Sequence, residues 1–299
     1  TDIKESVRKE GLKLTKSLVT ILTRALEKES NASSREILGR LIHLLLGNKG
    51  ILSDSQDVKD FSIKTLLKLC KTKSKALKPY IADLIENFIN LFSTMEPEIV
   101  NYLALNAGNF NIDNQEFDAR RLQDVGKSLL MDAIDFLLTQ LDEEAMPEFL
   151  TRLEHSVKHS VGLPSKVSGS KVLMTLVMNY HSLMRPYSSK LLEIASSQIK
   201  DRNNTVASCY AAAAGYICRI SPVEAVIKYS DKIAKMYFKP KEPGDERSRI
   251  LASNASNCVS KYSGDQFSVV ASGFLPLAFI GTFDRLEQVK HCLLYTSPS

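Results

Sequence analysis

Two histidines, His155 and His159, have the residue type and spacing in this sequence that come nearest to metal-binding chemistry. Four residues apart on a helix, they would share one face, as the two histidines of an HExxH zinc site do. The residues between them include no glutamate, and the sequence offers no evident third ligand. We therefore interpret both histidines as surface polar residues and predict neither a metal nor a cofactor.

A second candidate is the segment 162–171, GLPSKVSGSK, which has the glycines and lysines of a phosphate-binding loop ahead of a helix N-terminus. Six residues separate Gly162 from Gly169 instead of four, Ser170 precedes Lys171, and a helix rather than a strand comes before, so we predict no nucleotide site. Two interpretations remain. The segment is a helix–helix connection with a sharp turn, or it is a contact loop for an acidic partner, with Lys166 and Lys171 flanking exposed backbone donors.

A row of lysines forms the third candidate. Its members follow one another at steps of four, three, four and three: Lys64, Lys68, Lys71, Lys75 and Lys78. On a continuous helix they would line one face and suit an acidic protein surface. The alternative is a solvated outer face on a helix that ends near residue 74. Aromatic residues do not alternate with these lysines, which argues against single-stranded nucleic acid. The candidate partner contacts are thus Lys166, Lys171, Lys64, Lys68, Lys71 and Lys75.

We find no other residue pattern in the sequence that indicates catalysis. No Ser/His/Asp or Cys/His arrangement is recognisable. The acidic pair Glu143 and Glu144 lies beside Asp142 at the start of a helix, where carboxylates stabilise the positive end of the helix dipole. We predict that the chain is not an enzyme.

The elements that carry these side chains are helices, most clearly over residues 185–220. Apolar residues recur there at steps of three and four in two stretches, separated by the polar turn 201–204. The first stripe is Tyr187, Leu191, Ile194, Ala195 and Ile199, and the second is Val206, Cys209, Tyr210, Ala213 and Ile217. A helical hairpin of this kind cannot bury both faces alone, so it needs similar hairpins stacked on either side.

Further helices are expected along the rest of the chain. They cover residues 3–28, 34–46, 55–70, 77–92, 97–107, 120–141, 146–159 and 172–183, with polar breaks at 108–116, 162–170 and 239–245. In 34–46 we expect Ile37, Leu41, Leu44 and Leu45 to face inward. The triplet at 78–80 opens a helix as that at 185–187 does, and later helix pairs recur at about 40 residues, the HEAT or armadillo period.

Composition supports this prediction. Among 299 residues, 13 glycines and 10 prolines are few and tryptophan is absent, which favours helices over strands. We predict an all-α fold, a HEAT/armadillo-like α-solenoid of stacked antiparallel helix pairs over residues 1–290. Residues 291–299 have no helical phase, and we expect a non-native or disordered tail there. No apolar run approaches 18 residues and the sequence has no initiator Met, so we expect a fragment of a longer soluble protein without a transmembrane segment.

Charge and cysteine content narrow the class of partner. The net charge is only +5, with 34 acidic residues interspersed among 39 basic ones, so we predict no nucleic-acid partner. The five cysteines are an odd number without CxxC spacing, which indicates reduced thiols packed inside an intracellular protein.

Several stretches, taken in order, resemble the large HEAT-repeat adaptor and scaffold proteins of the 26S proteasome, near the C-terminal end of that family. They are EPEIVNYLAL at 96–105, SVGLPSK at 160–166, PYSSKL at 186–191, DRN at 201–203 and LPLAFIG at 275–281. The resemblance implies a non-enzymatic protein that bridges the core and regulatory particles of the proteasome, supports its assembly and quality control, and is found in cytoplasm and nucleus. Another HEAT scaffold, such as a nuclear transport receptor or a phosphatase-type scaffold, is the alternative.

Overall fold

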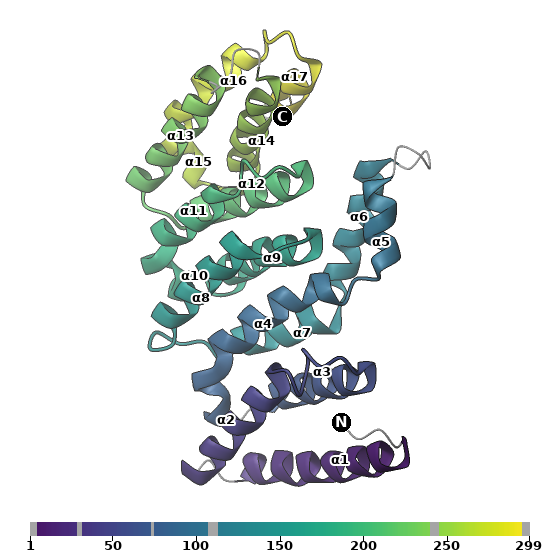
Figure 1. Ribbon diagram of the computed structural model, residues 1–299. Helices are drawn as coiled ribbons and strands as arrows, with labels where there is room; N and C mark the ends of the chain where they lie inside the picture. The colour runs from purple at the N-terminus through teal and green to yellow at the C-terminus, as the bar shows by residue number, and fades with distance from the viewer. Residues whose placement is uncertain (1–4, 29–31, 73–74, 107–112, 240–244, 295–299) are drawn as a thin grey trace. The chain divides into compact units, whose positions relative to one another are not determined.

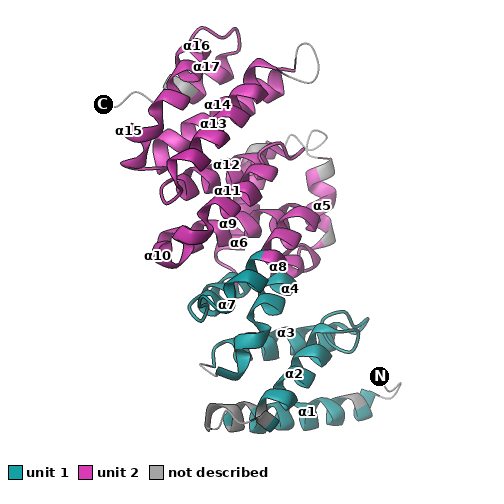
Figure 2. Ribbon diagram, turned by 90° about the vertical axis from the view of Figure 1, so that its left-hand side faces the viewer, with its two compact units in different colours: residues 1–88, 129–150 teal, residues 89–128, 151–299 magenta. Residues whose placement is uncertain are grey.

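The computed structural model describes residues 5–28, 32–72, 75–106, 113–239 and 245–294, and every regular element within these ranges is helical (Figure 1). The all-α class is therefore confirmed. These residues form two compact units, residues 1–88 with 129–150 and residues 89–128 with 151–299 (Figure 2). No described helix combines the length and hydropathy that a membrane span requires.

Among the described residues, the first unit contains four whole α-helices, a 3-10 turn and parts of two more helices. They are α1 (Glu5–Lys28), α2 (Ala32–Leu46), α3 (Gln56–Cys70), η1 (Lys75–Tyr80), the first half of α4 (Ile81–Thr94), α7 (Leu129–Leu138) and the beginning of α8 (Met146–His159). In this unit α3 packs against α2 and α7. Their shared core includes Leu66, Leu69, Ile134 and Leu137, none more than 1% exposed.

The inward face of α2 differs from the predicted one. Leu45 is buried as expected, but Ile37 and Leu44 are 45% and 48% exposed, while Leu38 and Ile42 form the core. Helix α2 is apolar on most sides, so periodicity alone does not fix its rotation. Gly39 fixes it, because the Tyr80 hydroxyl lies where a Cβ would stand.

The second unit stacks antiparallel helix pairs. It holds the end of α4 and of α8, α5 (Glu98–Leu105), α6 (Asn114–Gly126), α9 (Leu163–Asn179), α10 (His181–Met184), η3 (Arg185–Tyr187), α11 (Ser188–Ser197), α12 (Asn204–Cys218), α13 (Val223–Phe238), α14 (Glu246–Tyr262), α15 (Gln266–Val270), η4 (Ala271–Gly273), α16 (Leu275–Gly281) and α17 (Glu287–Leu294). Helix α12 packs between α9 and α14, and α11 packs beside α13, which is the arrangement of a solenoid (Figure 1).

The hairpin at 185–220 is confirmed. Leu191, Ile194, Ala195 and Ile199 are at most 1% exposed, and so are Val206, Tyr210, Ala213 and Ile217 on the partner helix. At the turn, the Asn203 side chain accepts a hydrogen bond from the Val206 N–H at 3.1 Å and so caps α12. Later in α12, Gly215 lies against the backbone carbonyl of Cys258, which lets α12 and α14 approach closely.

The two Pro-Tyr openings also match in structure. Lys78-Pro79-Tyr80 lies in η1 ahead of α4, and Arg185-Pro186-Tyr187 forms η3 ahead of α11. Proline has no N–H to donate, and a tight turn at a helix start tolerates this. The predicted helix at 77–92 therefore begins as a 3-10 turn and becomes α-helical at Ile81.

Several boundary predictions are wrong. The stretch 120–141 is not one helix, since α6 ends at Gly126 and α7 begins at Leu129. The predicted break at 162–170 is almost wholly helical, because α9 begins at Leu163. Residues 291–294 complete α17, although we expected no helical phase there. Of the predicted break at 108–116, residues 114–116 belong to α6, and the predicted helix 172–183 is interrupted between the end of α9 at Asn179 and the start of α10 at His181. The predicted breaks and tail also include residues 108–112, 240–244 and 295–299, which lie outside the described residues.

Candidate partner-binding site

The segment 162–171 starts with a glycine that the backbone requires. Gly162 precedes α9 with φ +86°, a left-handed conformation that favours glycine, and its Cβ position is occupied by the Ser93 side chain. Ser93 and Ser165 exchange hydrogen bonds, each backbone N–H donating to the other's hydroxyl oxygen at 3.0 and 3.2 Å. The first turn of α9 is thereby joined to the end of α4, and the Ser165 N–H is occupied by this contact rather than exposed for a ligand.

Lys166 points back into its own unit. Its Nζ lies 2.5 Å from Asp201 Oδ2, and the pair is only partly exposed, at 30% for the lysine and 8% for the aspartate side chain. The Lys166 carbonyl accepts a hydrogen bond from the buried Tyr210 hydroxyl at 2.9 Å. Burial raises the pKa of Tyr210 above its ordinary value, so the phenol stays a donor. Lys166 therefore ties α9 to the turn before α12.

Lys171 also has an intramolecular role. Its Nζ donates to the Leu122 carbonyl at 3.0 Å and lies where a Cβ on Gly126 would stand. An ammonium placed on a late carbonyl of α6 offsets the negative end of that helix dipole. This contact stabilises the end of α6 at Gly126, where we expected a longer helix.

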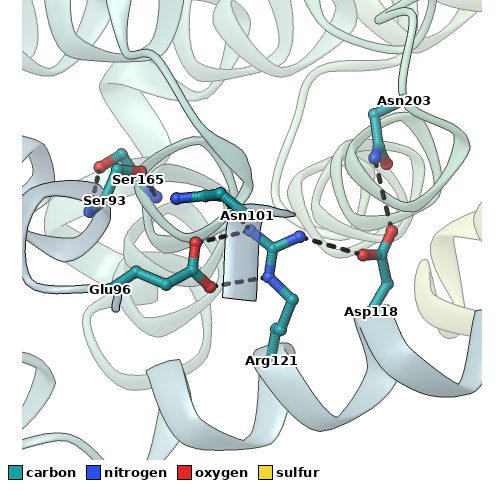
Figure 3. A network of polar contacts seen from close by, with 7 residues as sticks. All are labelled: Ser93, Glu96, Asn101, Asp118, Arg121, Ser165 and Asn203. Carbon is teal, nitrogen blue, oxygen red and sulfur yellow. Dashed lines mark hydrogen bonds and ion pairs between the residues drawn. The ribbon is translucent and has the colours of Figure 1, made fainter. Parts of the chain in front are cut away.

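An ion-pair network that sequence reasoning missed joins α6 to its neighbours (Figure 3). Arg121 donates from Nε and Nη2 to the two oxygens of Glu96 at 2.7 and 2.6 Å. Both side chains are about one-tenth exposed, at 10% and 9%. Burial opposes the charge of Arg121, but its hydrogen bonds and charge pairing with Glu96 and Asp118 prevail and hold its pKa above the ordinary value.

Asp118 extends the network to α12. It lies 3.4 Å from Arg121 Nη1, and its Oδ2 accepts from Asn203 Nδ2 at 3.4 Å (Figure 3). The same oxygen accepts from Thr205 Oγ1 at 2.9 Å. From α14, the Arg247 guanidinium donates to Asn204 Oδ1 at 3.0 Å and to the carbonyls of Asp201 and Arg202. Arg121 Nη2 also donates to Asn101 Oδ1 of α5 at 3.3 Å, and the Lys166–Asp201 pair adds α9. One polar network therefore joins α5, α6, α9, α12 and α14.

The basic row is only partly continuous. Lys64 and Lys68 lie on α3, but α3 ends at Cys70 and Lys75 begins η1, so one straight helical face does not carry all of them. Lys64, Lys68, Lys71 and Lys75 are exposed and form no ion pair with another described residue. Lys78 instead pairs with Asp142 at 2.7 Å and Glu144 at 2.6 Å within the same unit. The four exposed lysines of the row therefore remain candidate contacts that no other described residue neutralises.

The acidic stretch at 142–144 has a structural role. Asp142 accepts from the Ala145 N–H at 3.1 Å as α8 approaches, and hydrogen bonds from Lys78 and from this N–H lower the pKa of Asp142. Its position before the helix agrees with the predicted dipole effect.

His155 and His159 lie on one face of α8, as predicted. Their rings stack with centroids 4.4 Å apart, and His159 Nδ1 lies 2.9 Å from the His155 carbonyl oxygen. They line a cavity of about 420 Å³ together with Asn90, Ser93 and Ser156. Across the described ranges, no group of three or more His, Cys, Asp or Glu side chains is arranged to hold a metal ion.

The side chains of the described network hold neighbouring helices together through hydrogen bonds and ion pairs. Within it, no nucleophilic side chain is paired with a general base. The sequence did not reveal this network because its partners are far apart along the chain. Glu96 and Arg121 are separated by 25 positions, and Asp118 and Thr205 by 87, so no local pattern connects them. The stretches 96–105 and 201–203, which carry much of the resemblance to the scaffold family, do contain Glu96, Asn101 and Asn203.

Comparison with known proteins places these features in a wider group. The HEAT-repeat domain of the family described as "Proteasome adapter and scaffold protein ECM29" matches residues 77–238. "Proteasome component ECM29" of Saccharomyces cerevisiae is 39% identical over 97% of this chain. "Proteasome adapter and scaffold protein ECM29" of Homo sapiens is 30% identical over 99%, and "Proteasome component ecm29" of Schizosaccharomyces pombe is 27% identical over 94%.

The relatives are much longer than this chain. The aligned region is 16% of the budding-yeast and human proteins and 17% of the fission-yeast protein. The chain therefore spans about one-sixth of the length of the relatives it matches.

Proposed function

The chain belongs to the family of the proteasome adapter and scaffold protein ECM29, and from that premise we propose that it is a protein-binding segment of a non-enzymatic scaffold for the 26S proteasome. The observation that carries the proposal is the family match over 77–238, which includes elements of both compact units. Stacked helix pairs supply extended surfaces of the kind that scaffolds use. The matched family favours this function over a transport receptor or a phosphatase scaffold.

The finer parts of the proposal concern what the scaffold does. We propose that it bridges the core and regulatory particles and supports proteasome assembly and quality control. The names of the relatives, which call them proteasome adapters, scaffolds or components, support this. We also propose that it acts in cytoplasm and nucleus. The five cysteines, all free in the structure, agree with a reducing compartment.

Among the candidate contacts, we propose that the exposed lysines of the first unit meet the partner first. Lys64, Lys68, Lys71 and Lys75 are solvent-facing cations without ion pairs to described residues. Such charges accelerate and orient association with an acidic surface. Lys166 and Lys171 stay candidate contacts, but each already has an intramolecular partner. A new partner would have to compete with those contacts.

The experiment is a pull-down with the tagged 299-residue chain against purified 26S proteasome, with core and regulatory particles also offered separately at low and moderate salt. We expect retention that weakens as salt increases, because exposed charge pairs are screened. The double variant Lys64→Glu/Lys68→Glu should reduce retention roughly tenfold. Lys59→Glu is the matched control, since Lys59 is partly exposed on α3 and is not part of the row.

Two results would count against these proposals in different ways. If retention is unchanged by salt and by the double variant, the lysine row is not the contact surface, but the proposed scaffold function still holds. Absence of retention by the proteasome and by either particle would argue against a proteasome-binding role for this segment.

A further inference from the structure

A groove between α11 and α13 is not part of the polar network described above. We call it the α11–α13 groove; it has a volume of about 420 Å³, and its floor is formed by Leu192, Ala225 and Tyr229. Leu192 and Tyr229 are each 3% exposed, so the floor is firmly packed. The rim residues Glu193 and Lys228 are exposed, so solvent reaches the groove along its length.

Charge is unevenly distributed along this groove. Glu224, Lys228 and Lys232 follow one another at single-turn spacing on α13, so the acidic end lies at the start of the helix and the basic end further along. Lys232 reaches across to α11, where its Nζ donates to the Ser196 carbonyl at 2.8 Å and to the Ser196 hydroxyl at 2.9 Å. It therefore marks the far end of the groove.

The cations at this end are incompletely neutralised. Burial and the nearby charge of Lys200 lower the pKa of Lys232, and Glu193 is the acidic group that opposes this shift. Lys200 and Lys228 are exposed and form no ion pair with another described residue. A carboxylate placed here would meet the ammonium groups of Lys228 and Lys232 against the carboxylate of Glu193, and Lys200 adds positive charge from outside the lining.

The dimensions suit a short peptide. The lining positions of α11 extend over residues 189–196, about 10 Å along the helix axis. An extended chain advances about 3.3 Å per residue, so three to four residues fill the groove. An apolar floor with a few placed polar groups is typical of a site that holds one side chain and orients its neighbours.

We propose that the α11–α13 groove binds an acidic peptide segment of a partner protein, with an apolar side chain on Leu192 and Tyr229 and a carboxylate beside Lys228 and Lys232. Glu224 disfavours acidic groups at the other end, so the charge gradient fixes the direction of the peptide. The chemistry does not depend on which complex supplies the peptide, so the test is separate from proteasome binding.

The test measures fluorescence anisotropy of a labelled peptide of alternating Leu and Asp, about six residues long, with the 299-residue chain. A peptide with Asn in place of Asp is the neutral probe. We expect salt-sensitive binding of the acidic peptide and clearly weaker binding of the neutral one. Lys228→Glu should weaken the acidic peptide roughly tenfold, because a favourable charge contact becomes a repulsive one.

Two further variants separate charge from shape. Ala225→Leu fills the floor without changing charge and should also weaken binding roughly tenfold. Lys127→Glu is the matched control, since Lys127 is exposed in the turn after α6 of the same unit and does not line the groove, and it should leave binding within about twofold. Far-UV circular dichroism confirms that each variant is folded.

The proposal is overturned by any of four results. They are absence of binding up to about 1 mM peptide, equal affinity for the acidic and neutral peptides, equal loss in Lys127→Glu and Lys228→Glu, or unchanged affinity in folded Ala225→Leu.

Discussion

Arg121 is a side chain whose role depends on residues far from it in sequence. Its bidentate pair with Glu96 is nine-tenths buried, and it also donates to Asp118 from Nη1 and to Asn101 from Nη2. A buried ion pair is weak evidence for stability, because desolvating both charges offsets their attraction. Removing one partner is different, since it leaves the other charge buried without its counter-ion.

Glu96→Gln is therefore expected to lower the free energy of unfolding by about 3 kcal/mol. Urea denaturation followed by far-UV circular dichroism measures this. Glu116→Gln is the matched control, because Glu116 pairs with Arg120 at 3.4 Å with both side chains at least 70% exposed. It should change stability by less than about 0.5 kcal/mol. Equal effects of the two substitutions would contradict the role assigned to the network.

At the scale of elements, the helix pairs of the second unit are held by close backbone approach as well as by side chains. Gly215 of α12 faces the carbonyl of Cys258 on α14, and neither backbone can move aside as a flexible side chain would. Gly11 of α1 is the opposite case, with nothing within 4 Å of its Cβ position. In α12, glycine is needed because a side chain would not fit. In α1, it brings only the entropic cost of a glycine inside a helix.

Gly215→Ala should destabilise the chain by about 2 kcal/mol or more, because overpacking forces α12 and α14 apart. Gly11→Ala should instead stabilise α1 by roughly 0.5–1 kcal/mol, since alanine is the better helix former. Hydrogen exchange of amides in α12, α14 and α1 reports each effect locally. Unchanged protection of α14 in Gly215→Ala would show that the approach is not tight.

At the scale of the whole molecule, the cysteines share one chemical state. Cys70, Cys218 and Cys258 are buried, and Cys209 and Cys292 are half-buried. Burial raises the pKa of the Cys70 and Cys258 thiols from 9.0 to about 12 and raises that of Cys218 as well. The reactive thiolate is thus depleted throughout the core.

Alkylation by iodoacetamide at pH 7.5 should therefore label Cys70, Cys218 and Cys258 very slowly in the folded chain. A rise of three pKa units lowers the thiolate population about a thousandfold. Mass spectrometry of timed samples measures each site, and denatured protein gives the reference rate. Rapid labelling of Cys70 or Cys258 before unfolding would be inconsistent with the packing described.

The helical class and the family could be predicted from the sequence alone, because apolar spacing and ordered local motifs act over a few residues. The 185–220 hairpin, its polar turn and the buried stripe all follow from such local signals. The rotation of α2 was decided only by tertiary contact, since Gly39 meets Tyr80 on a helix apolar on most sides.

Which candidate lysines have an intramolecular partner also depends on the tertiary structure. Lys166 and Lys171 looked free in a glycine-rich stretch, yet Asp201 and the Leu122 carbonyl hold them. Those partners lie 35 and 49 positions away along the chain, so residue spacing could not predict the two contacts. The α11–α13 groove has the same origin, because it exists only where two helices from successive pairs pack side by side.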